Sequence, residues 1–441
     1  MTVHVAEREI LSVSMDASQK QKCADAVIHI LNNKHKTNMK QQYENLVSAS
    51  PSLDDLSVVA PLKPFAQQTL DFIDALSSSI MQSASARKHP ELMALAFWMR
   101  KANLTRLAES FYKEIGDRLY VPRGTVFHVA PSNVDTIFVY SWFLAMLSGC
   151  RNIVRLSSKR TEQAIVLTDL ISDLLENLKH QDIAKRTLLV RYPADNLITA
   201  DFSAVCDVRV IWGGNSTVEQ IRAIPIPAAA MDIAFSNKYS IALIHAERWL
   251  THNEGKRDAE VNEFWNDAYW FDQMGCSSPR LVLWVGEVEF VQKAAKDFWS
   301  RLDALLAKKQ TRFSDADYVN KRMAADSLAI DSSVRIDTGT ANNLVRVWLD
   351  TPALHINYHC GAGLFFESQL SSLAEIKGLL SRTIQTVSYC GWTKDEMRGF
   401  VLEAPLVGID RIVPFGQALN FATVWDGFDL TRVFLREITI S

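Results

Sequence analysis

The spacing of hydrophobic positions changes near Tyr120. Before this point, residues 64–83 and 90–117 carry apolar side chains at helical spacing, which predicts two amphipathic helices. After it, short β-branched and aromatic runs predict strands at 124–129, 152–156, 187–192 and 208–212. Helical patterns alternate with these strands at 136–148, at 161–178 and from Thr217 onward. Such alternation is typical of a parallel sheet covered by helices.

A second unit of the same kind begins after Ile241. The pattern predicts helices at 259–274, 290–307 and 371–383, and strands at 279–285, 344–349, 354–358 and 434–440. The fold class is therefore predicted to be α/β, with two Rossmann-like domains and a cleft between them. Residues 1–60 are predicted to form an N-terminal helical extension, with polar, helix-forming residues and a break near Pro51.

Composition excludes several classes of protein. Of the 441 residues, 48% are apolar and 22% are charged, and the net charge of −3 with no long basic run argues against a nucleic-acid partner. No stretch approaches the ~20 apolar residues of a transmembrane helix, so we expect a chain that is not integral to a membrane. Six scattered cysteines without a CxxC pair favour free thiols in a reducing, cytoplasmic compartment.

The segment with the most specific chemistry is Phe271-Asp-Gln-Met-Gly-Cys276-Ser-Ser-Pro-Arg280. The pattern places Cys276 at a tight junction between a helix and a strand, where Gly275 allows a turn and a close approach of substrate. A half-exposed thiol at such a junction suits a nucleophile, and neighbouring backbone N–H groups suit an oxyanion. A buried structural cysteine is an equally good interpretation of the local sequence.

Two loops after predicted strands are candidate ligand sites, since α/β proteins bind ligands there. In Val129-Ala-Pro-Ser-Asn133, the Asn133 amide is suited to donate to an oxyanion, although a helix N-cap explains it at least as well. In Ile211-Trp-Gly213-Gly214-Asn215, a glycine turn opens a helix whose N-terminus suits a pyrophosphate, a weak signal alone. His355 and His359 lie on a predicted strand about 13 Å apart, too far to share a metal with Cys360. No metal site is predicted.

These segments together resemble the aldehyde dehydrogenase superfamily, and more closely the long-chain acyl-CoA reductase family, which includes the reductase subunit of the bacterial bioluminescence fatty-acid reductase complex. Cys276-Ser-Ser-Pro-Arg280 resembles the nucleophile motif of that family. Its C-terminal signature resembles Arg411-Ile-Val-Pro-Phe-Gly416 followed by Trp425-Asp-Gly-Phe-Asp-Leu430. The resemblance covers residues from about 60 to the end.

The resemblance implies a role for each matching residue. Cys276 would be the nucleophile and Asn133 the oxyanion-hole asparagine. Arg155 would replace a lysine beside the cofactor ribose, and Gly213, Gly214 and Asn215 would meet the cofactor phosphates. It also implies a cofactor-binding domain at 61–240, a catalytic domain at 241–405, and a return segment at 406–441 that carries a candidate oligomerisation strand.

Two departures from the superfamily pattern bear on the chemistry. Members that hydrolyse their acyl-enzyme carry a glutamate base, whereas the corresponding stretch here, from Met231 to Ser240, holds only the offset acid Asp232. This absence favours exchange with a thiol such as CoA over hydrolysis. The motif that holds the nicotinamide-side ribose also has no clean counterpart, and His359-Cys-Gly-Ala-Gly363 is the candidate to replace it.

The expected function is reduction of an acyl-CoA to a fatty aldehyde through an acyl-enzyme on Cys276, with CoA as the leaving group. We expect NADPH as the hydride donor because Arg155, Ser157, Lys159 and Arg160 follow a strand with no acid before Glu162. The alternatives are an acyltransferase or thioesterase that uses the same cysteine, and a non-catalytic subunit of an acyl-processing complex. Expected partners are the acyl-CoA substrate, an acyl-protein synthetase or acyl-transferase, and further copies of this chain.

Overall fold

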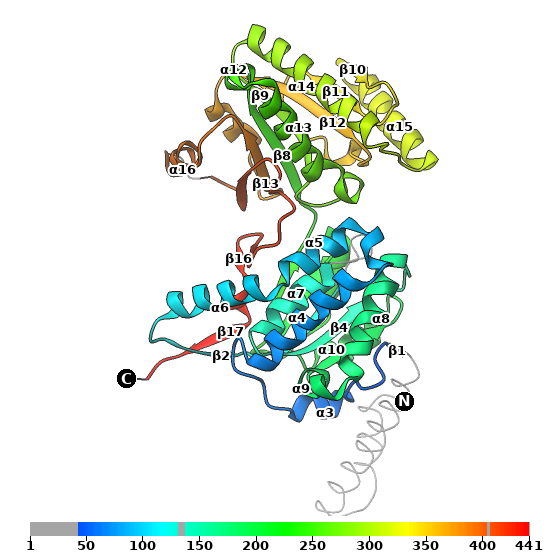
Figure 1. Cartoon of the computed structure of the whole chain (residues 1–441), viewed down its shortest axis with the longest axis vertical. Helices are drawn as coiled ribbons and strands as arrows, with labels where there is room; N and C mark the ends of the chain where they lie inside the picture. Colours follow the sequence, from blue (N-terminus) through cyan, green and yellow to red (C-terminus); the bar gives the residue numbers. More distant parts are fainter. Residues whose placement is uncertain (1–42, 131–136, 404–405, 441) are drawn as a thin grey trace, which may run out of the picture.

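A computed structural model describes residues 43–130, 137–403 and 406–440, and shows two α/β lobes stacked along the long axis (Figure 1). Each lobe is built on its own mainly parallel sheet. The predicted fold class is confirmed. The predicted extension at 1–60 lies largely outside the described residues. Its described part packs on the first lobe, where β1 (Glu44–Asn45) pairs with a strand of the sheet and Leu56 is buried.

The sheet of the first lobe has six strands in the order β1-β5-β4-β3-β6-β7. All neighbouring strands are parallel except β1, which is antiparallel to β5. The parallel strands are β3 (Thr125–Val129), β4 (Arg151–Leu156), β5 (Thr187–Arg191), β6 (Val208–Trp212) and β7 (Met231–Phe235). The strand order reverses between β3 and β6, so the carboxyl ends of these two strands mark the crevice where sheets of this kind bind ligands.

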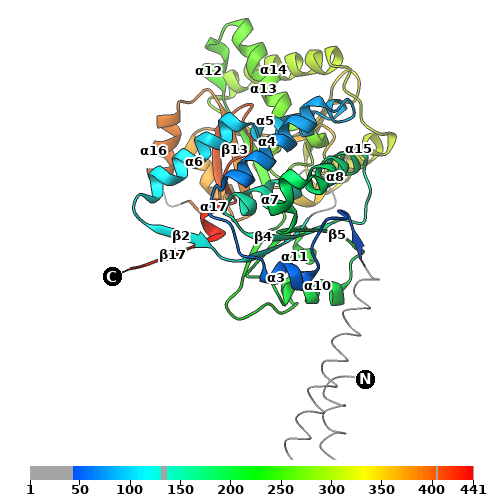
Figure 2. The ribbon, with the colours of Figure 1, turned by 60° about the horizontal axis from the view of Figure 1, so that its bottom comes forward.

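Helices cover both faces of this sheet (Figure 2). One face packs against α4 (Gln67–Gln82), α5 (Pro90–Trp98), α6 (Lys101–Ile115), α7 (Ile137–Leu147), α8 (Glu162–Glu176) and α9 (Gln181–Ala184). The other packs against α3 (Leu53–Val58), α10 (Asn196–Ser203) and α11 (Asn215–Arg222). Because both faces are covered, β3, β5 and β6 are buried along their whole length. Buried strands read as continuous apolar runs, which is why the sequence revealed them.

The second lobe holds a seven-stranded sheet in the order β10-β11-β12-β9-β8-β13-β14. Only the β10–β11 pair is antiparallel. The strands are β8 (Tyr239–His245), β9 (Pro279–Val285), β10 (Val334–Thr338), β11 (Val345–Leu349), β12 (Leu364–Leu370), β13 (Ile384–Cys390) and β14 (Arg411–Pro414). The helices are α12 (Ala246–Thr251), α13 (Glu254–Tyr269), α14 (Val288–Lys308), α15 (Asp315–Asp331) and α16 (Lys394–Glu403).

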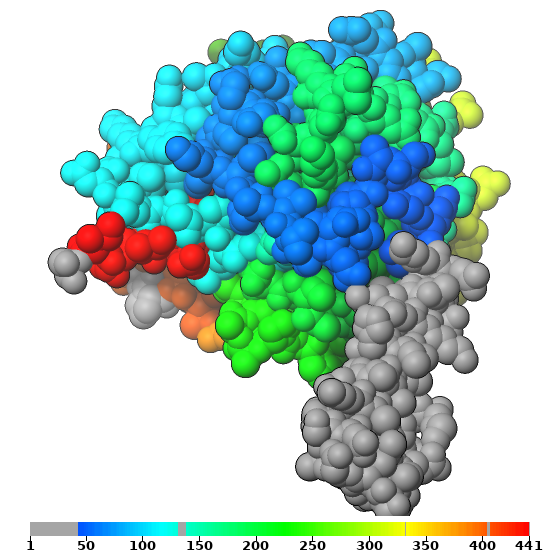
Figure 3. Space-filling view, turned by 90° about the horizontal axis from the view of Figure 1, so that it is seen from below, coloured from blue at the N-terminus to red at the C-terminus, as the bar shows by residue number. Residues whose placement is uncertain are grey.

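The C-terminal segment returns from the second lobe to the first. It forms a small hairpin of β15 (Val424–Trp425) and β16 (Phe428–Asp429), then α17 (Leu430–Val433). The last strand, β17 (Leu435–Ile438), pairs antiparallel with β2 (Leu119–Pro122) to form an arm at the edge of the first lobe (Figure 1). In Figure 3 the C-terminal residues lie on the surface beside the segment around residue 120. The final strand predicted at 434–440 is therefore present and is paired within the chain.

Two predicted elements of the second lobe are wrong. Residues 354–358, predicted as a strand, include a 3-10 turn (Ile356–Tyr358), and the buried strand β12 follows it at Leu364–Leu370. Residues 371–383, predicted as a helix, form a 3-10 segment (Leu373–Leu379) that leads into β13. Periodicity within one short segment does not separate a buried strand from a helical turn. The position of each segment relative to the sheet, which decides between them, cannot be read from the local sequence.

Among the helices of the described residues, none has both the length and the apolar character needed to cross a bilayer.

Candidate active site between the two lobes

The carboxyl edge of the first sheet meets the amino edge of the second. The connection from β7 to β8 is only residues 236–238, so the end of one strand lies beside the start of the other. Cys276, just before β9 at this amino edge, is half-buried and packs against the hydrophobic core of the first lobe. The predicted nucleophile therefore lies where the two lobes meet.

The loop before Cys276 has an unusual backbone. Phe271, Asp272 and Gln273 have φ values of 54°, 52° and 64°, three consecutive residues in the left-handed region. This conformation costs roughly 1–2 kcal/mol for each non-glycine residue. Such strain persists only where the surroundings fix it, and it concentrates at functional sites. Gly275, which the sequence predicted to provide the turn, does not have a positive φ, but a Cβ there would lie 3.1 Å from Ser278 Oγ and 3.2 Å from Leu419 Cδ2.

Gln273 holds this strained loop in place. Its buried amide donates to the carbonyl oxygens of Pro279 (2.9 Å) and Leu364 (3.0 Å) and accepts from the backbone N–H of Gly363 (3.0 Å). Nearby, the N–H of Ala362 donates to the Asp272 carbonyl at 2.8 Å. The 359–363 loop thus lies directly against the nucleophile loop. A Cβ at Gly361 would come within 2.5 Å of the Asp272 carbonyl oxygen, so this contact requires glycine.

Two bulges at the amino edge of the sheet bring polar side chains toward Cys276. In the β8–β9 pair, Arg280 is an extra residue between the pairs made by Ser240 and Ile241. In the β13–β8 pair, Gln385 and Thr386 are likewise inserted opposite Ser240. Bulges re-aim side chains and are frequent beside active sites. The Ser240 hydroxyl joins the strands by donating to the Cys276 carbonyl (2.6 Å) and accepting from the Thr386 N–H (3.2 Å).

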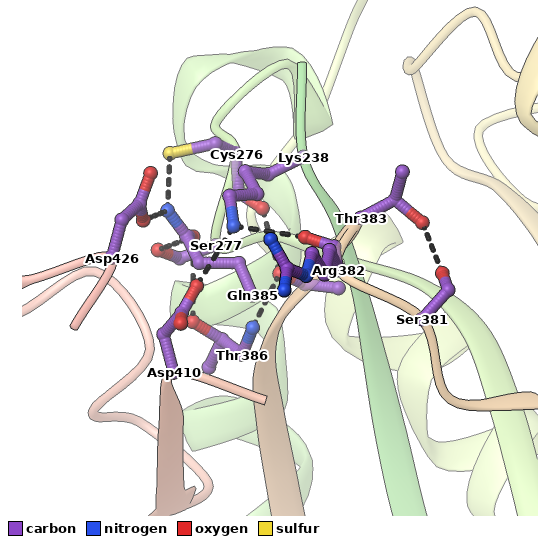
Figure 4. Close-up of polar contacts among 11 residues, drawn as sticks. Lys238, Cys276, Ser277, Ser381, Arg382, Thr383, Gln385, Thr386, Asp410 and Asp426 are labelled. Atoms are coloured by element: carbon purple, nitrogen blue, oxygen red, sulfur yellow. Dashed lines mark hydrogen bonds and ion pairs between the residues drawn. The ribbon is translucent and has the colours of Figure 1, made fainter. Parts of the chain in front are cut away.

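Gln385 contacts the thiol of Cys276 directly (Figure 4). Its Nε2 donates to Cys276 Sγ at 3.4 Å and also donates to the carboxylate of Asp426. Its Oε1 accepts from the Ser277 hydroxyl at 2.7 Å. The amide therefore has a defined orientation, with its N–H groups toward the sulfur and the carboxylate. Within the described residues, the backbone N–H of Cys276 has no acceptor, so it is available to a developing oxyanion.

Several groups set the pKa of the Cys276 thiol in opposite directions. Burial raises it, and the negative charge of Asp426 raises it further. Hydrogen bonds with Gln385 and Ser277 and the positive charge of Arg280 lower it. The net direction is upward, so the resting cysteine favours the thiol form. Burial also raises the pKa of Asp426 to about 6, which makes it a carboxyl that titrates near neutral pH beside the nucleophile.

A second group of buried polar atoms, around Arg280, lacks hydrogen-bond partners among the residues that the structure describes. Arg280 stacks on the ring of Tyr239 at 5.6 Å, but its Nε has no hydrogen-bond partner within the described part of the chain. The same holds there for His359 Nε2 and the Tyr239 hydroxyl. Burial, together with the Arg280 charge, lowers the pKa of His359 well below its usual range, so this imidazole is neutral. Buried polar atoms without partners are rare and are typical of sites that bind a ligand.

The C-terminal segment is fastened to the same edge by Asp267 on α13. Its carboxyl accepts from the N–H groups of Gly416 (2.8 Å) and Ala418 (2.9 Å). Arg411 supports the same turn by donating to the Ala418 carbonyl at 2.9 Å. Burial raises the pKa of Asp267 to about 7 despite these hydrogen bonds. The family-like segment 411–416 therefore builds the scaffold of the site.

On the first lobe, the predicted phosphate-binding residues lie at the carboxyl end of β6. Gly214 is the N-cap of α11, and a Cβ there would meet only Asn237 atoms, at 3.6 Å and beyond. The Asn215 side chain accepts from the Asn237 N–H at 3.2 Å, which fixes the turn to the connection between the lobes. Gly213 donates its N–H to the Phe235 carbonyl at 3.1 Å. Asn133 follows β3 in the sequence and lies outside the described residues.

The cations at the end of β4 and after it were expected to face a cofactor phosphate, and two of them contact other groups of the protein. Arg155 is half-buried, donates to the Tyr192 carbonyl at 3.2 Å and stacks on the Tyr192 ring at 5.2 Å. Lys159 is exposed, and its backbone N–H donates to the Ser157 hydroxyl. Arg160 forms an ion pair with Glu44 at 2.8 Å. An acid is therefore present beside these cations, although it comes from β1 rather than from the segment itself.

Comparison with known proteins identifies the family. The sequence matches the family described as Acyl-CoA reductase (LuxC) over residues 103–436. The chain belongs to the LuxC family of acyl-CoA reductases. No significant match was found among curated proteins.

Solved structures similar to this LuxC-family chain are aldehyde dehydrogenases. Methylmalonate-semialdehyde dehydrogenase from Oceanimonas doudoroffii has a TM-score of 0.61 and 11% identity, covering 92% of this chain and 90% of that one. Lactaldehyde dehydrogenase has a TM-score of 0.60 and 9% identity, with 89% of each chain covered. Betaine aldehyde dehydrogenase from Staphylococcus aureus has a TM-score of 0.60 and 13% identity, covering 84% and 82%. At these identities the likeness establishes the fold.

Asp232 is the acid nearest to the position where the hydrolysing superfamily members carry a glutamate base. In this LuxC-family chain its carboxylate pairs with another side chain. It forms a two-point ion pair with the buried Arg209, at 2.7 and 2.9 Å. The acid that does approach Cys276 is Asp426, from the C-terminal hairpin. Asp426 lies in the C-terminal family-like signature, but the sequence indicated no role for it. Gln385 lies in no motif and was not predicted. The only sequence signal was Asp426-Gly427 between two short apolar runs, which is typical of a tight hairpin.

Two other polar clusters of the second lobe lie away from the nucleophile. Within the described residues, His252, Glu260 and Cys390 are the one group whose ligand atoms lie within 4.8 Å of one another. His252 Nδ1 faces Glu260 at 2.8 Å within this group, whereas Nε2 faces the Lys256 ammonium, a donor, at 2.8 Å and not the acceptor that supports a metal-bound imidazole. A cavity of about 640 Å³ beside α14 and β10–β11 is lined by residues that include Trp299, Arg335 and Arg346, and it does not include Cys276.

Proposed function

We propose that this LuxC-family chain reduces an acyl-CoA thioester to an aldehyde with NADPH, using Cys276 as the covalent nucleophile. One observation carries the proposal. Cys276 lies on a fixed, strained loop that faces the carboxyl edge of a Rossmann-like sheet, with an oriented amide and an available backbone N–H beside its sulfur. A nucleophile, oxyanion donors and a nucleotide-binding edge are the parts that this reaction needs.

In the first half-reaction, the Cys276 thiolate attacks the thioester carbonyl. Charge develops on the carbonyl oxygen, and the Cys276 N–H together with the Asn133 amide would stabilise it. The bond from carbon to the CoA sulfur then breaks, and CoA leaves and takes up a proton. The product is an acyl thioester on Cys276, a covalent intermediate that divides one difficult step into two easier steps.

In the second half-reaction, the residues of the first lobe would hold the cofactor. The N-terminus of α11 with Gly213, Gly214 and Asn215 suits its pyrophosphate, because helix N–H groups are free there and Gly214 leaves room. Arg155, Ser157 and Lys159 would approach the 2′-phosphate. When bound, the reduced nicotinamide supplies a hydride to the acyl carbon. Hydride addition leaves the alkoxide of a thiohemiacetal on Cys276, which re-forms its carbonyl bond and expels the Cys276 sulfur as a thiolate, and the aldehyde is released.

The test is a direct assay of the purified chain. Acyl-CoA thioesters of different chain lengths are incubated with NADPH, and trapped aldehyde and released CoA are measured together. We expect one aldehyde and one CoA for each NADPH oxidised, no product with Cys276→Ala, and almost none with Cys276→Ser. CoA release without NADPH oxidation would instead identify a thioesterase or acyltransferase. Neither product with any thioester would point to a non-catalytic subunit.

A further inference from the structure

The C-terminal hairpin links the cofactor side of the first lobe to the nucleophile. Trp425 packs against the rings of Tyr140 (5.4 Å) and Trp212 (6.4 Å), and Phe428 packs against Phe235 (6.1 Å). Trp212 and Phe235 end the strands β6 and β7. The hairpin is therefore anchored on the first lobe, while its turn reaches the second lobe.

The turn of this hairpin presents Asp426 to Gln385. Asp426 and Gly427 have φ values of 48° and 78°, the two positive values that a two-residue type I′ turn requires. The carboxylate accepts from Gln385 Nε2, the same nitrogen that donates to Cys276 Sγ (Figure 4). A carboxylate only accepts hydrogen bonds, so it forces the N–H side of the amide to face it. The second N–H is then directed at the sulfur.

The opposite side of Gln385 is fixed as well. Its Oε1 accepts from Ser277, which follows the nucleophile directly, and from Thr386 at 3.4 Å. With the amide reversed, a carbonyl oxygen would face the Asp426 carboxylate. The charge of Asp426 therefore determines the orientation of the side chain whose N–H group donates to Cys276 Sγ at 3.4 Å.

We propose that Asp426 is a positioning residue for the nucleophile: it holds the Gln385 amide so that one N–H points at Cys276 Sγ, and it places a negative charge beside that sulfur. The proposal rests on the proposed function of Cys276. It also gives the Trp425-Asp-Gly-Phe-Asp segment a chemical role that a purely structural hairpin would not have.

The two parts of this role act in opposite directions on the thiol. The Gln385 N–H stabilises the thiolate and lowers the pKa of Cys276, whereas the ionised Asp426 carboxylate raises it. Other charges around Asp426 are Lys238, which favours its ionised form, and Asp410, which opposes it. Lys238 and Asp410 are themselves paired at 2.9 Å. Asp426 is the carboxylate whose charge acts on the sulfur, and the positive charges of Arg280 and Arg411 oppose it.

Alkylation of Cys276 by iodoacetamide, followed by peptide mass spectrometry across pH 5 to 9, tests this role. Asp426→Asn keeps an acceptor for Gln385 but removes the charge, so Cys276 should ionise at lower pH and react faster at pH 7. Each unit of fall in its pKa raises the thiolate fraction about tenfold. Because a less basic thiolate is less nucleophilic, the net gain in rate is about threefold. Gln385→Met should change the rate in the opposite direction.

The shape of the pH profile is the sharper readout. In the wild type, ionisation of Asp426 near pH 6 should flatten the rise of the logarithm of the rate with pH, because the new charge opposes loss of the thiol proton. In Asp426→Asn this flattening should disappear. Asp426→Ala also frees Gln385, so its rate at pH 7 should fall between the wild type and Asp426→Asn.

Asp429→Asn is the matched control, since Asp429 lies in the same hairpin, where it caps α17 and forms an ion pair with Arg432 at 3.4 Å. It should reproduce the wild-type profile. Identical alkylation profiles for the wild type and Asp426→Asn, or equal rates for the Asn and Ala variants at position 426, would overturn the proposal. Alkylation needs neither a thioester nor a cofactor. Shifted profiles in a protein that reduces no acyl-CoA would therefore uphold the positioning role and reject the proposed reaction.

Discussion

The two sides of the site between the lobes hold their polar groups in different ways. On the nucleophile side, Cys276, Arg280 and Gln385 are buried or half-buried, and a strained loop, two bulges and a distant hairpin fix their positions. On the cofactor side, Lys159 and Arg160 are exposed on a loop. A bond-making group must be held within a fraction of an ångström, whereas exposed cations can adjust to a charged ligand that attracts them. Single substitutions should therefore cost far more on the nucleophile side.

The largest effect is expected at the nucleophile itself. Cys276→Ala should abolish covalent acylation, and Cys276→Ser should come close to abolishing it, because an unactivated hydroxyl is a much weaker nucleophile than a thiolate. Peptide mapping after incubation with labelled acyl-CoA measures this. Cys360, half-buried in the neighbouring loop, provides the internal control and should stay unlabelled. A label on Cys360 or Cys390 would refute the assignment of the nucleophile.

Asn133→Ala should produce the next largest effect. If its amide stabilises the oxyanion, turnover should fall by about 10² to 10³ while acyl-CoA binding changes little. If Asn133 only caps the following helix, the variant should instead lose about 1 kcal/mol of stability and keep its turnover. Steady-state kinetics and urea unfolding of the same preparation separate the two. Unchanged turnover in a folded variant would exclude the catalytic role.

Asp267→Asn should change how stability depends on pH. The pKa of Asp267 is raised to about 7 in the folded protein from 3.8, so the folded state holds this proton more tightly than the unfolded state. The free energy of unfolding should therefore fall as pH rises from about 4 to 7, by about 1–4 kcal/mol for this group. Asn cannot ionise, so this contribution to the pH dependence should be absent in the variant.

Urea unfolding of both proteins from pH 4 to pH 8 measures that difference. Asn253→Ala is the control, because it removes the N-cap of α13, an amide oxygen that accepts from the backbone N–H of Lys256, and adds or removes no titratable group. It should lower stability by about 1 kcal/mol at every pH. A wild type whose stability rises between pH 4 and 7, with the same slope in Asp267→Asn, would contradict the buried carboxyl.

The smallest effects are expected on the cofactor side. Lys159→Ala should lower kcat/KM for NADPH about two- to fivefold and leave the NADH value unchanged, because an exposed ion pair contributes only 0.2–1 kcal/mol. Arg155→Ala should act in the same direction. Glu44→Gln, which frees Arg160 from its ion pair, should raise the preference for NADPH. A wild type that prefers NADH, or a cofactor ratio that none of these variants changes, would show that the cations do not select NADPH.

The parts of the fold that the sequence revealed are those with local signals. Strands 208–212 and 279–285 were predicted with the bounds that the structure shows, since buried parallel strands between turns leave continuous apolar runs. Cys276 was found because a family-like motif surrounds it. The helix predicted to reach Met274, by contrast, ends at Tyr269, where a left-handed turn begins that no local pattern signals.

No local sequence pattern indicated which side chains surround the nucleophile. Gln385 lies 109 residues from Cys276, and it faces the sulfur only because a bulge interrupts β13. Glu44 lies 116 residues from Arg160, so the acid beside the cofactor-side cations was invisible in their own segment. Contacts of this kind depend on strand register and on loop closure between distant segments. Residue spacing within one segment carries no information about them.

The chain crosses between the lobes twice, once at residues 236–238 and again between β14 and the hairpin of β15 and β16. Two rigid bodies joined at two points move most easily by rotation about a hinge axis that passes through both points. Opening the lobes would then widen the site while leaving the segments on that line nearly still. Asp426 belongs to the second crossing. The hydrogen bond between Asp426 and Gln385 should therefore persist while substrate enters and product leaves. The Gln385 N–H would then remain directed at the Cys276 sulfur between turnovers.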